Sequence, residues 1–296
     1  MVKPRLFLPL VLLVVVIFIA LATSLPAGAP GEAGGAAVVT RPGIGVVSAA
    51  AAPQVLTDGG RYASPAGAHL PLMIRWRNWQ PEFGQAIVYA REFDLDGMLA
   101  LNAPVEKMVM VASYQELSQV MARADELHAA GVTTVGLNTE NGPGMTPGDE
   151  MQTLDNPDPD VNIVARMANL ARQNGFRVMW GPVRNVADNV SDATIRAMMA
   201  AGMNGLALQE QKFIEVSPAA ARLAQVNQTR DRYLRLAREA GIDDFRIDVQ
   251  IMHERCPNLD NCVAFVQGLE AIPVNSIAIW SNGPIPAAFV SAIRSN

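Results

Sequence analysis

The chain has 296 residues, half of them hydrophobic, and a formal net charge of −5 at pH 7. This length suffices for one large domain or two small ones with a sizeable core. A nucleic acid is excluded as an expected partner, because the charge is mildly negative and Lys and Arg form no cluster beyond residue 5 to neutralise phosphates.

The first 22 residues are predicted to be a targeting segment. Lys3 and Arg5 precede an uncharged apolar run over residues 6–22, which is the pattern of an export signal. The run is slightly shorter than the roughly 20 residues that cross a bilayer, and Ala20-Leu21-Ala22 resembles a cleavage site. Residues 1–22 are therefore expected to be a signal peptide or a signal anchor. Either alternative makes the rest of the chain extracytoplasmic, secreted or held at the membrane by residues 6–22.

Residues 23–68 are dominated by Ala, Gly, Pro, Ser and Thr, with few large apolar side chains to bury. Such a composition is typical of a flexible tether. The folded domain is accordingly predicted to span residues 69–296.

Within residues 69–296, short apolar runs alternate with longer amphipathic ones. The runs of strand length are 72–76, 108–113, 134–140, 178–183, 206–211, 245–252 and 277–282. The amphipathic runs, predicted to be helices, are 114–130, 161–174, 192–201, 219–240, 262–271 and 286–293. An eighth strand is expected in 85–91 or before Leu70.

A helix, a glycine, a short link and an apolar strand follow one another four times, and this order is typical of βα units around a parallel sheet. The glycines are Gly131, Gly175, Gly202 and Gly241, each expected in the left-handed conformation that ends a helix. Eight such units in this length predict an α/β fold of the (β/α)8 TIM-barrel type. An open doubly wound sheet is the alternative, but the sequence has no glycine-rich phosphate loop.

In such a barrel the functional site lies at the carboxyl ends of the strands, and alternation decides which side chains face the axis. Branched residues such as Val135 and Leu137 are expected to face the helices. The positions expected to face the axis at four strand ends are Gly136, Asn138, Glu140, Ala207, Gln209, Gln211, Asp248, Gln250, Met252, Ala278, Trp280 and Asn282. Glu210 falls on the opposite face.

Amide groups beside an aromatic ring suit a neutral, polyhydroxylated ligand, since amides donate to and accept from hydroxyls and the ring stacks on a sugar. The candidate ligand-binding residues are Asn138, Gln209, Gln211, Gln250, Trp280, Asn282 and Arg184. A phosphorylated ligand stays open, because Arg75, Arg77 and Arg184 lie near strand ends. For each residue alone, the alternative is a packing or loop-capping role.

The repeated helix-glycine-strand order, the ends L-Q-E-Q and V-Q-I, and the closing S-I-A-I-W-S-N resemble exported bacterial barrels of the glycoside-hydrolase-like kind from uncharacterised families. The resemblance covers about residues 70–295 and implies a barrel that faces a glycan. Two features depart from sugar-cleaving barrels: the run D-x-x-D-x-D-x-E is missing, and the last strand ends on Asn282 in place of a carboxylate.

Glycosidic cleavage usually needs two carboxylates. Glu140 is the candidate acid/base, and its partner would be Glu254, Asp248, or a Glu210 turned inward by a bulge. Because the sequence does not decide which residue is the second carboxylate, the alternative function is a surface-displayed binding or scaffold barrel without catalysis. No cofactor is expected.

The two cysteines, Cys256 and Cys262, stand close together in H-E-R-C-P-N-L-D-N-C. This spacing favours a small disulfide-closed loop in an oxidising compartment, with two unpaired thiols as the alternative. A metal site is not expected, since His253 is the only imidazole nearby.

Overall fold

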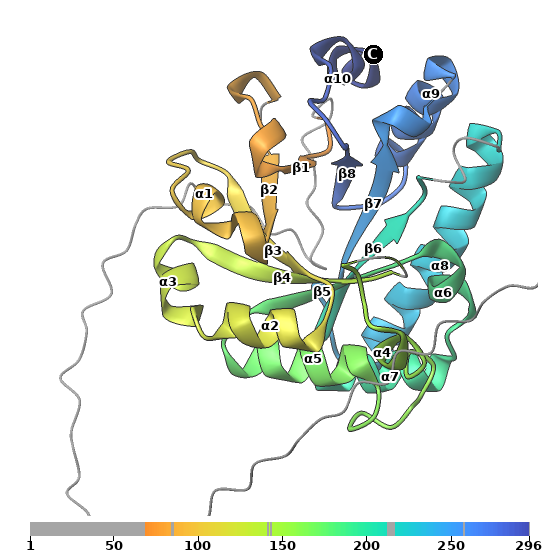
Figure 1. Cartoon of the computed structure of the whole chain (residues 1–296). Coiled ribbons are helices and arrows are strands. Elements are labelled where there is room, and N and C mark those ends of the chain that lie inside the picture. The colour runs from red at the N-terminus through yellow and green to blue at the C-terminus, as the bar shows by residue number, and fades with distance from the viewer. Residues whose placement is uncertain are drawn as a thin grey trace, which may run out of the picture. The chain divides into compact units, whose positions relative to one another are not determined.

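The computed structural model of the chain describes residues 69–83, 86–140, 142, 144–211, 217–256 and 258–295. The targeting segment and the tether predicted over residues 1–68 lie outside the described residues. The remainder contains eight parallel strands that close into a barrel in chain order (Figure 1). These strands are β1 (Leu72–Arg75), β2 (Ala86–Arg91), β3 (Glu106–Val111), β4 (Val132–Thr139), β5 (Arg177–Pro182), β6 (Met203–Gln209), β7 (Arg246–Met252) and β8 (Ser276–Trp280). The (β/α)8 prediction is confirmed.

The helices lie outside the ring of strands (Figure 1). They are α1 (Leu95–Leu99), α2 (Tyr114–Met121), α3 (Ala124–Ala129), α4 (Gly148–Met151), α5 (Ile163–Gln173), α6 (Arg184–Asn189), α7 (Asp192–Ala201), α8 (Ala219–Glu239), α9 (Leu259–Glu270) and α10 (Ala287–Arg294). Only short 3-10 turns, η1 (Trp76–Asn78) and η2 (Pro81–Phe83), connect the described parts between β1 and β2. The predicted helix over 114–130 is two helices, α2 and α3, and the eighth strand is β2.

Alternation along the strands separates two apolar clusters. Val135, Leu137 and the branched residues of β6, β7 and β8 belong to the larger cluster, which packs the barrel wall against the helices. A smaller, separate cluster fills the lumen and consists of Met73, Ile87, Tyr89, Met108, Met179, Ala207 and Ala278. Parallel strands bury both of their faces, and here the branched residues face the helices while the alternate residues face the lumen. The predicted facing of the strands is therefore confirmed.

Helix ends follow the local sequence. The side chains of Ser113, Asn162, Ser191 and Asn258 accept hydrogen bonds from the first turns of α2, α5, α7 and α9. Such N-caps satisfy backbone donors that have no partner inside the helix. The four glycines predicted to end helices all have positive φ angles, between 73° and 124°, as expected of residues that reverse the chain.

Charged residues occupy the lumen at the amino ends of the strands. Arg246, the first residue of β7, donates from Nε to both carboxylate oxygens of Asp248 at 3.0 and 2.9 Å, and from Nη1 to Glu106 of β3 at 2.9 Å. Asp248 is fully buried, and burial raises the pKa of its carboxyl while the Arg246 guanidinium opposes that rise. This paired layer lies below the lumen cluster and supports it.

Candidate functional site

A cavity of about 160 Å³ opens at the carboxyl ends of the strands. Residues from all eight strands line the cavity, and Gln250 of β7 lies at its rim. The position agrees with the site that a parallel βα barrel is expected to carry. Its rim, wall and floor differ chemically.

Four amide side chains form a hydrogen-bonded chain across the rim. Gln250 Nε2 lies 3.5 Å from Gln211 Oε1, and Gln211 Nε2 donates to Gln209 Oε1 at 3.1 Å. Gln209 Nε2 donates in turn to Asn138 Oδ1 at 2.8 Å and to the carbonyl of Gly181 at 3.0 Å. The chain links β7, β6 and β4, so these amides are held in place before any ligand arrives.

The two ends of the amide chain keep unused hydrogen-bonding capacity. Asn138 Nδ2 has no partner among the described residues, and neither has Gln250 Oε1. An unused NH2 group therefore stands at one side of the rim and an unused carbonyl at the other. A group that both donates and accepts, such as a hydroxyl, matches this pair.

Glu140 brings a carboxylate to the rim. Its backbone is fixed by Thr146, which donates from N to Glu140 O at 3.1 Å and accepts at Oγ1 from Glu140 N at 3.2 Å. Its side chain makes no ion pair or hydrogen bond with a described residue. Arg91, also in the lining, is held by Glu116 through two bonds of 2.9 Å and donates to the carbonyl of Gly144 at 3.2 Å.

Two aromatic rings form one wall of the cavity. Tyr89 of β2 and Trp280 of β8 are stacked with an interplanar angle of 13° and ring centroids 6.2 Å apart. Burial raises the pKa of the Tyr89 hydroxyl well above its ordinary value, so this hydroxyl stays protonated at neutral pH. Among the described residues it has no hydrogen-bond partner, and it remains a donor available to the cavity.

The floor and the far wall are apolar. The lining there consists of Met73, Met108, Met110, Met179, Ala207, Ala278, Gly136 and Gly181. Gly136 leaves room for thioether groups, because a Cβ at that position would lie 2.1 Å from Met110 Sδ and 3.3 Å from Met108 Sδ. The site is thus apolar below and polar above.

The structure brings together five of the residues singled out from the sequence. Asn138, Glu140, Gln211, Gln250 and Trp280 all line the cavity. Gln209 lies directly behind them, buried, and connects Asn138 to Gln211 through its hydrogen bonds.

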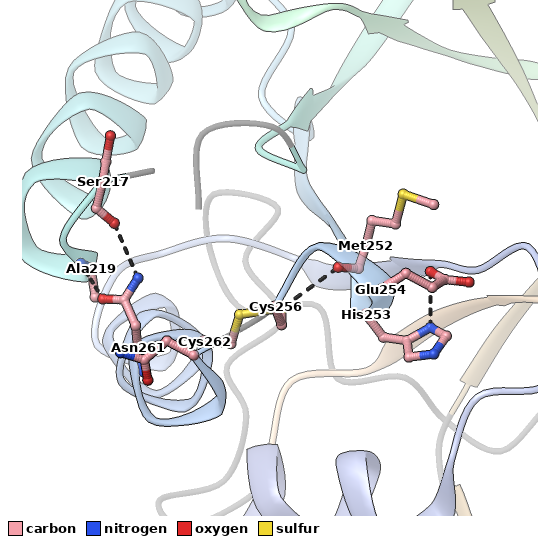
Figure 2. Close-up of a disulfide and its surroundings, with 9 residues drawn as sticks. Ser217, Ala219, Met252, His253, Glu254, Cys256, Asn261 and Cys262 are labelled. Atoms are coloured by element: carbon pink, nitrogen blue, oxygen red, sulfur yellow. Dashed lines mark hydrogen bonds and ion pairs between the residues drawn. A yellow bond between two sulfur atoms is a disulfide. The ribbon is translucent and has the colours of Figure 1, made fainter. Parts of the chain in front are cut away.

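Glu254 and Asn282 are not part of the cavity lining. Glu254 Oε1 accepts from Asn282 N at 2.7 Å and from Ser281 Oγ at 3.1 Å. Its other oxygen lies 3.0 Å from His253 Nδ1 (Figure 2). These contacts use the carboxylate to fix the turn after β8. Asn282 itself is exposed.

Arg184 lies on the other side of the barrel wall, where it is buried beside Glu210 of the segment after β6. It donates to Asp188 at 2.8 Å and to Thr229 Oγ1 at 2.8 Å. Arg222 of α8 completes the pairing, with its Nε 3.0 Å from Glu210. Glu210 faces outward as predicted, and all these charged groups are used within the protein.

The predicted disulfide between Cys256 and Cys262 is confirmed, with the two Cα atoms 5.9 Å apart (Figure 2). It ties the segment after β7 to the first turn of α9. From that turn, Asn261 donates to the carbonyl of Ser217 at 3.0 Å and accepts from Ala219 N at 2.8 Å. The disulfide and the hydrogen bonds of Asn261 together join three neighbouring segments at the carboxyl end of the barrel.

The sequence analysis missed half of the cavity. Met73, Tyr89, Arg91 and the methionines of β3 and β5 alternate along their strands as the amides do on β4 and β6. The test of alternation that placed the amides would have placed these residues too. The prediction covers inward positions on β4, β6, β7 and β8, and these residues lie on the other four strands.

In the part of the chain that the structure describes, no three side chains of His, Cys, Asp or Glu gather as they do around a metal ion. Within the same residues, every helix is too short or too polar to span a bilayer.

No family model and no curated protein matches the chain. Solved structures with a similar fold include an endo-β-1,4-mannanase of glycoside hydrolase family 26 from Cellulomonas fimi, at 12% identity and a TM-score of 0.47, with 80% of this chain and 71% of that one covered. A lyase/mutase-type protein from Burkholderia cenocepacia shares 11% identity at a TM-score of 0.40, with 73% and 77% covered. A fusion of a xylose isomerase-like TIM barrel with 4-hydroxyphenylpyruvate dioxygenase shares 12% identity at 0.43, with 77% and 41% covered. At these identities the likeness concerns the fold alone.

Proposed function

We propose that the barrel binds a carbohydrate at the carboxyl ends of its strands. The observation that carries this proposal is the hydrogen-bonded chain of neutral amides beside Trp280 on one cavity rim. Sugars combine hydroxyl groups with an apolar ring face, and a rim of amides next to an indole matches both.

The charges at the rim favour a neutral ligand. Arg91 is already paired with Glu116 through both of its bonds of 2.9 Å. Of the three arginines considered for a phosphate, Arg184 is buried in its own ion network, and Arg75 and Arg77 both pair with Asp94. Glu140 adds a single negative charge without a described partner. A phosphorylated ligand would therefore meet more repulsion than attraction at this rim.

The cavity supports binding better than cleavage. Among the described residues of the lining, Glu140 is the one carboxylate, whereas hydrolysis of a glycosidic bond usually requires two. Glu254 is engaged with Ser281 and Asn282, and Asp248 lies in the charged layer below the cavity. Catalysis by Glu140 with a second carboxylate stays the alternative.

The disulfide supports an extracytoplasmic location, because such bonds persist in oxidising compartments. We infer that the barrel works outside the cytoplasm, secreted or held at the membrane by residues 6–22. A carbohydrate of the cell envelope or the surroundings would then be within its reach.

Binding is tested by titrating the full-length protein with neutral oligosaccharides and following Trp280 fluorescence and heat. We expect saturable binding that the Trp280→Ala substitution weakens at least tenfold, since the stacking surface is removed. As a matched control, Trp79→Ala removes an indole outside the cavity lining and should leave the affinity unchanged. If no neutral sugar binds at millimolar concentration, the proposal is rejected.

The catalytic alternative is tested with aryl glycosides, whose cleavage releases a coloured phenol. Turnover that the Glu140→Gln substitution abolishes would replace binding by hydrolysis. Equal turnover by the wild type and the substituted protein would remove Glu140 from the mechanism.

A further inference from the structure

Below the amide rim the cavity becomes an apolar chamber. Its side chains come from inward positions of five strands and are Met73, Met108, Met110, Met179, Ala207 and Ala278. None of them offers a strong hydrogen-bonding group. A hydroxyl placed among them would lose its bonds to water without replacement, so the chamber is unsuited to the sugar ring that the rim would hold.

The chamber does not continue through the barrel. Beneath it, Arg246, Asp248 and Glu106 fill the lumen with charged groups bonded to one another. A group that enters from the mouth therefore stops on the thioether layer. The cavity has depth for one substituent, and no passage for a polymer is expected through the lumen.

The size and shape of the chamber point to a ring. The whole cavity, amide rim included, has a volume of about 160 Å³, close to that of engineered apolar cavities of roughly 150 Å³, which stay dry and bind benzene. It therefore has room for about one ring. The parallel rings of Tyr89 and Trp280 form a flat wall on one side. The small residues Gly181 and Ala207 leave space on the other.

We propose that the ligand is amphipathic: a sugar held at the amide rim that carries one apolar ring, aromatic or alicyclic, which enters the methionine chamber. The sugar half of this proposal rests on the proposed function. The apolar half rests on the chamber alone. Because thioether side chains adapt to irregular shapes, the chamber selects for the apolar character and size of the ring more than for its outline.

The proposal is tested by comparing methyl and phenyl β-glycosides of glucose, galactose and mannose in titrations of the full-length protein. The phenyl compound of whichever sugar binds should bind at least tenfold more tightly than its methyl counterpart. Ala278→Leu, which fills the chamber, should remove that advantage, so that the phenyl and methyl glycosides bind with equal affinity. Ala193→Leu makes the same change on the exposed surface of α7 and should preserve it.

A second measurement leaves the chamber of the titrated protein unsubstituted. The protein is labelled with methyl-13C methionine and titrated with benzyl alcohol, which carries the ring without the sugar. The methyl resonances of Met73, Met108 and Met179 should shift, with their assignment taken from single Met→Leu variants. Resonances of methionines on the outer side of the wall, such as Met198, should stay in place.

The outcomes separate the two proposals. Equal affinities for methyl and phenyl glycosides, with unchanged chamber methionines, would overturn the apolar chamber and leave carbohydrate binding intact. Shifted methionines without affinity for any glycoside would overturn carbohydrate binding and support the chamber. A phenyl advantage that survives Ala278→Leu would also overturn the chamber, because the ring would then lie elsewhere.

Discussion

At the amino ends of the strands, Arg246, Asp248 and Glu106 fill the lumen, and their charged groups bond to one another. At the carboxyl ends, the amides are also bonded in a chain, but among the described residues the NH2 group of Asn138 at one end and the carbonyl of Gln250 at the other have no partner. Strand β7 contributes to both regions, with Asp248 below and Gln250 above on the same inward face.

Polar residues inside a barrel therefore do not by themselves indicate a ligand-binding site. Buried polar groups are normally satisfied within the protein, as Asp248 is by Arg246. A ligand-binding region is recognised by polar groups that are held in position and still have unused hydrogen-bonding capacity. By this criterion the rim qualifies, whereas the lower layer and the Arg184–Glu210 network do not.

The largest effect is expected at the lower layer. Asp248→Leu removes the partner of a buried guanidinium, and such a break costs about 3–5 kcal/mol. Gln250→Leu, two residues further along the same face, should cost less than about 1 kcal/mol, because its carbonyl has no partner among the described residues and its hydrogen bond to Gln211 is long. Urea denaturation of both variants measures the contrast. Similar losses of unfolding free energy in the two variants would show that the two ends of β7 do not differ in how their polar groups are paired.

The next contrast is between two glutamates at strand ends. Glu210 is fully buried between Arg184 and Arg222, so Glu210→Gln should cost on the order of 3 kcal/mol. Glu140 has no described side-chain partner, and Glu140→Gln should change stability by less than about 0.5 kcal/mol. Thermal and urea unfolding check both. A large loss in Glu140→Gln would mean that this carboxylate is used structurally.

The disulfide should stabilise the carboxyl end of the barrel. Closing so short a loop contributes about 2 kcal/mol by chain entropy, so the double variant Cys256→Ala/Cys262→Ala should unfold at correspondingly lower urea. Hydrogen exchange should increase in the segment after β7 and in the first turn of α9, while β7 near Arg246 keeps its protection. Uniformly faster exchange along β7 would argue that the two ends of the lumen are not independent.

A smaller loss of stability than that from opening the disulfide is expected when the amide chain is broken at Gln209. Gln209→Leu leaves Asn138 Oδ1 and the carbonyl of Gly181 without their donor, which costs about 1–2 kcal/mol. Because Asn138 would lose its fixed orientation, sugar affinity should also fall several-fold. The measurement is a titration beside an unfolding curve, and full affinity in Gln209→Leu would contradict the role of the chain in positioning the rim.

Much of the fold could be predicted because its signals are local. Apolar runs of strand length, helices that end on Gly131 or Gly175, and the repetition of the unit all act over short stretches of chain. The division of 114–130 into α2 and α3 was missed, since both halves continue one amphipathic pattern. The sequence allows two positions for the eighth strand, 85–91 or before Leu70. The structure has it at β2, which pairs with β1 and β3.

The site was predictable in part for the same reason. Alternation placed Asn138, Glu140 and Gln250 at the axis, and they line the cavity. It could not place Arg184, because a residue just beyond a strand no longer follows the alternation and joins α6 outside the wall. Nor could it show that Glu254 would be used by the turn after β8.

Local sequence patterns set the order of strands and helices and the face on which each side chain lies, since both depend on periods of two and 3.6 residues along the chain. Which inward residues meet depends on how the barrel closes. Gln209 and Asn138 are 71 positions apart in sequence, and Tyr89 and Trp280 come from strands on either side of β1. Closing the barrel sets these distances, because the register of each strand against the next depends on packing contacts that no short stretch of sequence contains.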